Sequence, residues 1–461
     1  MVNILGANSV SGGYEIDNSL RFNDGDSPKL GLAFGSGGNT KTWTASCWFK
    51  RGIISSRQSF LNVGSSGSEY MSLYIDSDDK LYWVTESGGN LYRIGSSALF
   101  RDPSAWYHIV FRQDTTDGTA NNRFRYYING AEVDTGAFNA QPTQNFDGKI
   151  GGNDTHYIGS NRDGDGEFMD GYLTEYHYLD GISYDPTYFG EFDDNGVWIP
   201  KKYTGSYGTK GFYLEFKQTG TSANSSGIGA DTSGNDNHWT PTNLAATDVT
   251  TDTPTNNFAT VNPLGGATSS GKWTFSEGNT QIQQNDNGNW RATGSTMAVA
   301  NGKWYWEIVF YAGTMSEIFV GVHGSEVSLE GTNRWVAGST LFYNHEGGEI
   351  RQDGTNTTAD YGVLTAGDIL GVALNMDDKQ ISFYDNGSAI VSNFALSSSI
   401  TGFAMPTFMS DASNIVYKVN FGNPAFAISS GNADANGYGD FEYAVPSGYY
   451  SLCTKNLGEF G

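Results

Sequence analysis

The sequence predicts an all-β protein of two antiparallel β-sandwiches (jelly rolls) joined by an extended segment, and three observations support this. Apolar and polar residues alternate along many short stretches, which is the period of a β-strand. The chain is rich in aromatic residues, with 27 Tyr, 27 Phe and 11 Trp, and these favour strands over helices. Its 61 glycines, with many Asn, Ser and Thr residues, supply turns. We find no long amphipathic helical stretch in the sequence.

The strands are predicted where the alternation is clearest. An Asn-Gly pair tolerates the positive φ of a type I′ turn, so it is a strong hairpin signal. Two such pairs, Asn129-Gly130 and Asn386-Gly387, follow alternating stretches directly. The most regular alternation predicts strands at residues 43–49, 124–128, 304–310, 381–383 and 415–421.

A change in composition divides the chain. At ~150 residues per domain, 461 residues suggest two or three domains. Residues 219–270 are poor in charge and rich in Thr, Asn, Gly, Ser and Pro. This segment should run extended over a surface, with Trp239, Phe258 and Val261 as anchors. The predicted parts are a first sandwich at 1–218, the linker at 219–270, a second sandwich at 271–426 and an irregular C-terminal segment at 427–461.

The net negative charge limits the classes of partner that the chain could bind. Lys and Arg number 26 against 50 Asp and Glu, a net charge of −24, which would repel nucleic acid and anionic membranes. We expect no membrane insertion, because no window holds ~18 consecutive apolar residues. The N-terminus lacks the pattern of a signal peptide. Cys47 and Cys453 lie at opposite ends of the chain, so we expect folding in a reducing cytoplasm.

The first half resembles a laminin-G-like, concanavalin-A-type sandwich over roughly residues 14–217. The resemblance rests on AWYHIVFRQD at 105–114, RFRYYINGAEV at 123–133 and the Ile-Gly turn with its Gly-x-Leu-x-Glu strand within 156–181. These segments follow the order of the family's motifs. The resemblance implies a concanavalin-A-type β-sandwich for this half of the chain.

The second half resembles a SPRY domain, another sandwich of concanavalin-like build, over residues 271–422. The matching segments are GKWYWEIVF at 302–310, FVGV at 319–322, GDILGVALNMDDKQISFYDNG at 367–387 and PTFMSDASNIVYKVNFG at 406–422. Because SPRY domains are mostly binding modules, this resemblance implies recognition rather than chemistry.

Several further segments are similar to virion proteins of marine tailed phages. They include residues 6–23 and 189–216, together with DTSGNDNHWTPTNL, DTPTNNFATVNPL and PSGYYSLCTKNL. This resemblance implies an exposed structural protein, made in the host cytoplasm and located on the virion. A tail fibre that binds a host surface glycan or receptor is the first expectation, as a homotrimer or higher oligomer beside other virion proteins. A head decoration or tail-connecting protein is the alternative.

The residues that catalysis would need are not arranged for it. A retaining glycosidase requires two carboxylates ~5–5.5 Å apart. Glu15 and Asp17 have a suitable spacing but lie near the N-terminus, and Glu175 and Asp180 are too far apart along a strand. The sequence has neither a Gly-x-Ser-x-Gly elbow nor a His-Glu-x-x-His motif, and His108 fits a packed core position. We therefore expect no enzyme, with a glycan depolymerase as the weaker alternative.

One loop has the residue types of a calcium site. Residues 161–166 (NRDGDG) place oxygen ligands at alternate positions, as the start of an EF-hand loop does, but position 12 is Tyr172. Laminin-G-like domains can hold calcium at the sandwich rim, so the resemblance points to Asp163, Asp165 and Asp170. The alternative is that these residues only form turns. No other cofactor is expected.

The candidate ligand-binding residues lie in the SPRY-like half. Residues 324–354 form a long, turn-rich region that mixes aromatic and polar side chains. Aromatic faces can stack on sugars or peptides while polar groups fix orientation, although the large aromatics could instead fill the core. The candidates are Arg334, Trp335, Tyr343, Asn344 and His345.

Overall fold

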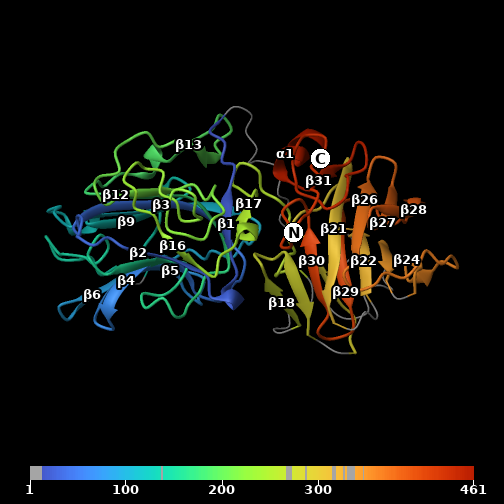
Figure 1. The fold of residues 1–461 in the computed structure, drawn as a ribbon, viewed down its shortest axis with the longest axis horizontal. Helices are drawn as coiled ribbons and strands as arrows, with labels where there is room; N and C mark the ends of the chain where they lie inside the picture. The colour runs from blue at the N-terminus through green and yellow to red at the C-terminus, as the bar shows by residue number, and fades with distance from the viewer. Residues whose placement is uncertain are drawn as a thin grey trace. The chain divides into compact units, whose positions relative to one another are not determined.

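The computed structural model describes residues 13–136, 139–265, 272–285, 288–313, 318–324, 328–329, 338–345 and 347–461. The regular secondary structure of the described chain is almost entirely β-strand, mostly antiparallel, which confirms the predicted all-β fold class (Figure 1). It divides into two units, Val10–Thr255 and Asn256–Gly461. The described helices are the short η1 (Asp24–Asp26), η2 (Ala120–Asn122), η3 (Pro186–Tyr188) and η4 (Ala246–Asp248), with a single α-helix, α1 (Thr454–Phe460).

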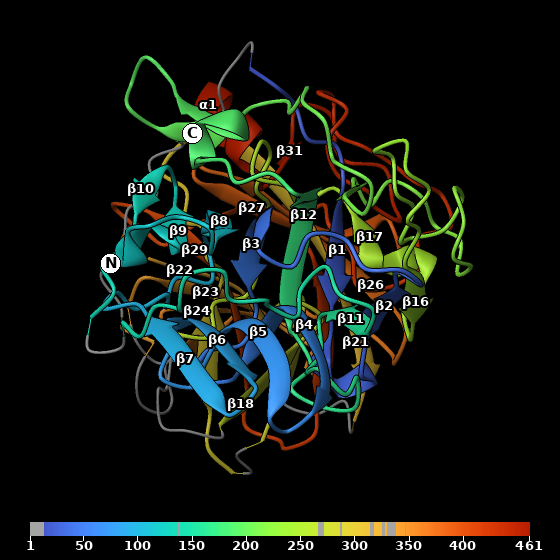
Figure 2. The same ribbon diagram turned by 90° about the vertical axis from the view of Figure 1, so that its left-hand side faces the viewer.

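The first unit is a sandwich of two sheets, which Figure 2 shows as two layers. One sheet has the order β10 (Ala131–Glu132), β9 (Phe124–Ile128), β8 (Trp106–Asp114), β3 (Thr42–Arg51), β12 (Gly171–Asp180), β1 (Ser19–Phe22) and β17 (Val249–Thr250), with β15 (Phe212–Leu214) beside β12. The facing sheet has the order β16 (Thr240–Thr242), β2 (Lys29–Ala33), β11 (Thr155–Ile158), β4 (Gln58–Ser66), β5 (Glu69–Ile75), β6 (Leu81–Ser87) and β7 (Asn90–Gly95). A separate hairpin pairs β13 (Gly190–Phe192) with β14 (Trp198–Pro200).

The strand alternation of the first unit builds its core. The face of β3 that carries Trp43, Cys47 and Phe49 is buried between the two sheets, as its spacing predicts. Strand β9 ends in the predicted hairpin, where Asn129 has φ 48° and Gly130 has φ 81°. Those positive φ values are the reason an Asn-Gly pair fits this turn.

The second unit is also a two-sheet sandwich. Its larger sheet has the order β18 (Trp273–Ser276), β19 (Gln281–Gln284), β30 (Val416–Asn420), β21 (Lys303–Ala312), β26 (Ile369–Asn375), β27 (Gln380–Asp385) and β28 (Ser388–Ala395). Its smaller sheet has the order β20 (Arg291–Gly294), β29 (Ala404–Ser410), β22 (Ile318–Gly324), β23 (Thr340–Asn344), β24 (Ile350–Gln352) and β25 (Thr355–Asn356). The alternating residues of β21, including Trp304 and Trp306, fill the core between these sheets.

The Thr/Asn-rich segment at 219–270 is shared between the two units. Its residues up to Thr255 belong to the first unit, where they supply β16 and β17 to the two sheets. From Asn256 onward the chain belongs to the second unit. Trp239 is buried in the first unit, and Phe258 and Val261 are buried in the second, so all three predicted anchors are interior residues.

A buried carboxylate attaches this segment to the first sandwich. The Oδ2 atom of Asp252 lies 2.7 Å from Nζ of Lys50, and its Oδ1 accepts a hydrogen bond of 3.1 Å from Nε1 of Trp106. Both charged side chains are at most 1% exposed. Nearby, the Ser19 and Thr250 hydroxyls lie 2.8 Å apart across β1 and β17. The segment is therefore held by specific polar contacts as well as by its apolar residues.

The C-terminal segment is part of the second sandwich. Strand β31 (Tyr450–Ser451) pairs in parallel with β21, and α1 follows it. Phe441, Leu452 and Cys453 are buried. A seven-residue helix is too short to give a periodic pattern, which is why the sequence did not reveal α1. No helix in the described ranges has the length and hydropathy needed to cross a membrane.

Candidate functional site

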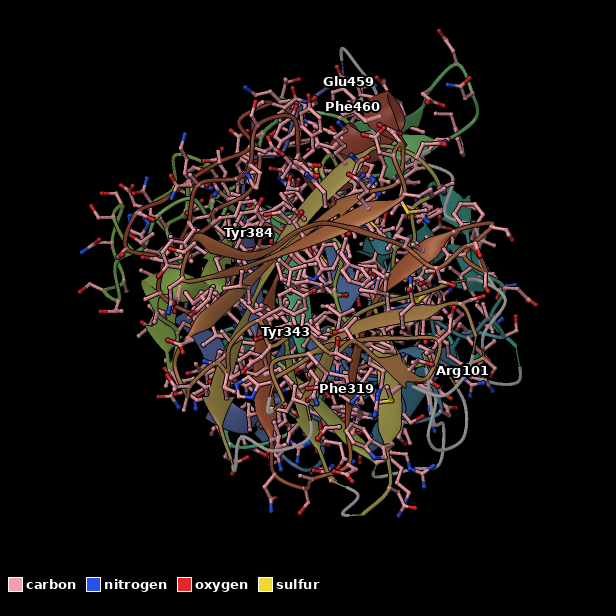
Figure 3. The ribbon with its side chains drawn as sticks, turned by 90° about the vertical axis from the view of Figure 1, so that its right-hand side faces the viewer. Arg101, Phe319, Tyr343, Tyr384, Glu459 and Phe460 are labelled. Carbon is pink, nitrogen blue, oxygen red and sulfur yellow. The ribbon has the colours of Figure 1, made fainter. Side chains whose placement is uncertain are left out.

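The predicted ligand residues of the second sandwich are divided between described and undescribed parts of the chain. Arg334 and Trp335 lie outside the described residues. Tyr343, on β23, is fully buried in the core, and its hydroxyl donates a hydrogen bond of 2.5 Å to the Gly362 carbonyl. Figure 3 shows Tyr343 in the crowded centre of this unit, where a ligand ring could not stack on it.

The two residues after Tyr343 are also engaged within the sandwich. Asn344 is half-buried, and its amide donates a hydrogen bond of 2.8 Å to Oε1 of Glu349. His345 is 1% exposed and packs edge-on against Phe310, with ring centroids 4.6 Å apart. The described part of this candidate set therefore faces the interior or a neighbouring turn, not solvent.

The three candidate calcium ligands have different environments. Asp163 and Asp165 are exposed on a turn, where Oδ1 of Asp165 accepts a hydrogen bond of 3.0 Å from the Asn161 amide. Asp170 is 1% exposed, and its backbone N–H donates to Oε1 of Gln58. Within the described ranges, no group of three or more His, Cys, Asp or Glu residues could hold a metal ion.

His108 is a structural histidine, as its alternation on β8 predicts. Nε1 of Trp198 donates a hydrogen bond of 3.0 Å to Nδ1 of His108, and Nε2 lies 2.9 Å from the Ser46 hydroxyl. Because Nδ1 accepts, the neutral ring carries its proton on Nε2 and donates it to Ser46. Burial, with a smaller contribution from His177, lowers the pKa of His108 to about 3.

The same requirement for a neutral ring makes the first unit sensitive to acid. Burial lowers the pKa of His156 to about 4, although its bond to the Asp154 carbonyl opposes the shift. Both rings ionise near pH 6.5 in the unfolded chain, so the unfolded state binds more protons below that pH. From pH 7 to pH 5, each histidine should lower the free energy of unfolding by about 2 kcal/mol.

Urea unfolding at a series of pH values tests this expectation. Between pH 4 and 6.5, His108→Gln should reduce the slope of unfolding free energy against pH. The reduction should correspond to the uptake of about one proton on unfolding. An unchanged slope in that variant would contradict the neutral assignment of His108. His156→Gln, at the Gly151 turn, provides the second, independent measurement.

One carboxylate on the outer face of β12 is buried and hydrogen-bonded. Glu175 sits at a β-bulge with φ 49°, and its Oε1 accepts hydrogen bonds from the Tyr14 and Tyr213 hydroxyls. Its Oε2 lies 3.4 Å from Nε2 of His177. Asp180 is engaged elsewhere, because its carboxylate accepts backbone N–H bonds from Asn39 and Lys210. Glu175 and Asp180, the pair considered from the sequence, are therefore held by separate sets of partners.

A polar hollow lies at the edge of the first sandwich. It is beside strands β9 and β10, which Figure 2 labels. Its volume is about 380 Å³, within the range of ~300–1,000 Å³ that is typical of ligand pockets. The described residues that line it come from three short stretches, namely Asn121, Phe124, Arg125, Tyr126, Glu132, Val133, Asp134, Thr135, Asn139 and Gln141. We call this group the rim hollow.

Hydrogen bonds hold the walls of the rim hollow in place. The Gln141 side chain accepts a bond of 3.1 Å from the Phe124 N–H and donates one of 3.0 Å to the Phe124 carbonyl. The Val133 N–H donates to the Tyr126 carbonyl at 3.0 Å. Asp134 accepts from the Ser97 hydroxyl at 3.0 Å. The hollow is therefore shaped by the fold before any ligand arrives, which lowers the entropic cost of binding.

Sequence reasoning did not find the rim hollow. Its polar residues are spread over about twenty positions, and none of them forms a recognised motif. Only the Asn129-Gly130 hairpin gave a signal, because it places β9 beside β10. The lining residues that follow β10, at 133–135, 139 and 141, have no periodicity from which their position could be predicted.

Comparisons with known proteins identify a domain in each unit. Residues 24–181 match the family model described as the concanavalin A-like lectin/glucanases superfamily, of laminin-G type. Residues 303–424 match the SPRY domain model. Both sandwich resemblances are therefore confirmed. No curated protein matches the chain.

Solved structures match parts of the chain at low identity. The SPRY domain of human HERC1 is 19% identical and covers 30% of this chain and 87% of that domain, with a TM-score of 0.27. A heptameric SAP-like pentraxin from Limulus polyphemus is 19% identical and covers 37% and 80%, with a TM-score of 0.28. A candidate carbohydrate-binding protein from Bacteroides ovatus is 15% identical and covers 50% and 58%, with a TM-score of 0.32.

Proposed function

We propose that the chain is a non-enzymatic recognition protein on the exposed surface of a tailed-phage virion, and that it binds a host surface glycan or protein. The observation that carries the proposal is the rim hollow, a preformed polar site on a concanavalin-A-like sandwich. The SPRY domain in the second unit supports a role in binding as well. The phage context rests on the similarity of residues 6–23 and 189–216 to virion proteins.

The proposed protein works as a tail fibre or another receptor-binding protein in several copies. A single polar hollow of about 380 Å³ makes few contacts, so one copy would bind weakly. A homotrimer or higher oligomer, held beside other virion proteins, would raise the effective concentration at the host surface. No cofactor is needed for this role.

Binding to intact host cells tests the proposal. Fluorescently labelled purified protein should bind saturably, and purified host surface polysaccharide should compete. The oligomeric state is measured on the same sample by light scattering, so that a failure to assemble is not taken for a failure to bind. If the assembled protein does not bind, the receptor-binding proposal is wrong. A particle map that places the chain on the capsid lattice would then identify a head decoration protein.

A further inference from the structure

We propose that the hairpin of β13 and β14, at residues 190–200, is an acid-released flap, which detaches from the first sandwich when His108 takes up a second proton. The proposal goes beyond the recognition function and does not depend on it. It rests on a hydrogen bond between Trp198 and His108 that the doubly protonated ring cannot make.

The hairpin stands apart from the two sheets of the first unit. Its strands pair with each other and with no other described strand. The backbone bonds of its turn, from the N–H of Asp193 to the Val197 carbonyl and from the N–H of Gly196 to the Asp193 carbonyl, also stay within it. Because an isolated two-stranded hairpin is only marginally stable in water, this one depends on side-chain contacts with the sandwich.

Trp198 provides the central contact. Its indole ring stacks on the His108 ring, with centroids 5.9 Å apart and planes inclined by 23°. Nε1 of Trp198 donates the hydrogen bond of 3.0 Å to Nδ1 of His108. The indole is also buried in a small apolar cluster with Ile16, Trp48, Trp106 and Tyr172. The contact therefore joins β14 of the hairpin to β8 of the sandwich.

A second proton on His108 would break this contact. The neutral ring accepts at Nδ1, so the second proton goes to that atom and converts it into an N–H donor. The indole N–H of Trp198 is also only a donor and cannot reverse its role. Two N–H groups would then face each other at a ring that is 1% exposed. Because a buried, unmatched charge costs free energy, protonation favours the state in which Trp198 has moved away.

The surroundings of His108 do not balance its charge. Ser46 and Trp48 face the ring from β3, and neither side chain is charged. Further along β3, the Lys50 ammonium is already paired with Asp252 at 2.7 Å. Among the described residues, no carboxylate forms an ion pair with His108. The charged ring would therefore have to reach solvent, and the hairpin covers it.

His177, on the outer face of β12, has a different set of partners. Its Nε2 lies 3.4 Å from Oε2 of Glu175, and its Nδ1 lies 3.0 Å from the Tyr207 hydroxyl. Its ring also contacts two further tyrosines, Tyr203 and Tyr213. Since a tyrosine hydroxyl can accept as well as donate, and a carboxylate balances a positive charge, His177 can be protonated in place. The acid response is therefore assigned to His108, whose partner cannot change its role.

Hydrogen exchange of the full chain at pH 7.5 and pH 5, corrected for intrinsic exchange rates, tests the proposal. Both values lie above the ordinary range of carboxyl ionisation. The His108 ring has a pKa of about 3 in the closed state and an ordinary pKa near 6.5 once released. The opening constant of β13 and β14 should therefore rise roughly 30-fold at pH 5, while β3 stays protected. An unchanged opening constant would overturn the proposal.

A second measurement on the unaltered chain follows the hydrogen bond itself. In a spectrum of the 15N-labelled indole groups, the Trp198 N–H should be protected at pH 7.5. At pH 5 it should exchange together with the hairpin amides. If the indole stays protected while those amides exchange, the hairpin opens without breaking the bond, and the proposal is wrong.

Two matched variants assign the response to one ring. The amide of His108→Gln can accept from Trp198 and donate to Ser46 without ionising, so the hairpin should open equally at both pH values. His156→Gln is the control, because His156 is also buried and has a pKa of about 4, but lies on β11 and accepts from the Gly151 N–H. That variant should keep the 30-fold rise. A full rise in His108→Gln, or its loss in His156→Gln, would overturn the assignment.

Discussion

Replacing Asp252 with alanine should lower the free energy of unfolding of the first unit by about 3–5 kcal/mol. The change would leave the Lys50 ammonium, which is 1% exposed, without its carboxylate at 2.7 Å. It would also remove the acceptor of the Trp106 indole N–H. An uncompensated buried charge is among the most destabilising results of a single substitution, so we expect this to be one of the two largest effects.

Guanidinium unfolding combined with hydrogen exchange measures this loss and locates it. Exchange should accelerate in β1 and β17, because Asp252 is the second residue after β17 and the Ser19 hydroxyl donates to its carbonyl. Glu191→Ala is the matched control, since its pair with Lys201 at 3.3 Å is about half exposed on both sides. Exposed pairs contribute little, so that control should change stability only slightly. A similar loss in the two variants would contradict the importance of the buried pair.

The second large effect is expected for Asp434→Ala in the second unit. Oδ2 of Asp434 accepts three hydrogen bonds of 2.8 Å, from the N–H and hydroxyl of Ser451 and from the Asn456 amide. Its Oδ1 accepts the N–H groups of Asn436 and Tyr438. Hydrogen bonds to a charged group contribute about 1.5–3 kcal/mol each, so a loss of at least about 3 kcal/mol is expected.

Hydrogen exchange should show where the second unit loosens. In Asp434→Ala, protection should fall first in β31 and α1, which the carboxylate holds against the sandwich. Asp360→Ala is a suitable control, because the exposed Asp360 carboxylate accepts one bond, of 2.9 Å, from the Gly362 N–H. If exchange in β31 and α1 stays slow in Asp434→Ala, the role assigned to this carboxylate is wrong.

The sequence predicted the parts of the fold that depend on local patterns. Alternation fixed the core face of β3, and the Asn-Gly pairs located the hairpins after β9 and β27, because both signals act within a few residues. The strand pairing made by residues 240–250, within the segment 219–270, could not be predicted in the same way. Its strands β16 and β17 are two or three residues long, and they pair with β2 and β1 more than 200 positions earlier. Local composition contains no information about such distant partners.

The candidate sites also depend on contacts between distant residues, which local sequence patterns do not predict. Residue type suggested Tyr343 and His345 as ligand-binding groups, but burial depends on the three-dimensional environment, and both side chains face the interior. Conversely, the sequence marked Tyr126 only as one apolar position of an alternating strand. Its place in the rim hollow depends on Val133, Asp134, Thr135, Asn139 and Gln141, which follow β10 without a regular pattern.

During translation, β17 is synthesised long after β1, the strand with which it pairs. Ser19 and Thr250, which meet across β1 and β17, are 231 residues apart. At about 5–20 residues per second, a ribosome needs about 10–50 s to make the intervening chain. Until then the outer edge of β1 has no strand to pair with, and open edges invite association between nascent chains. The first sandwich can therefore be completed only when more than half of the protein has been translated.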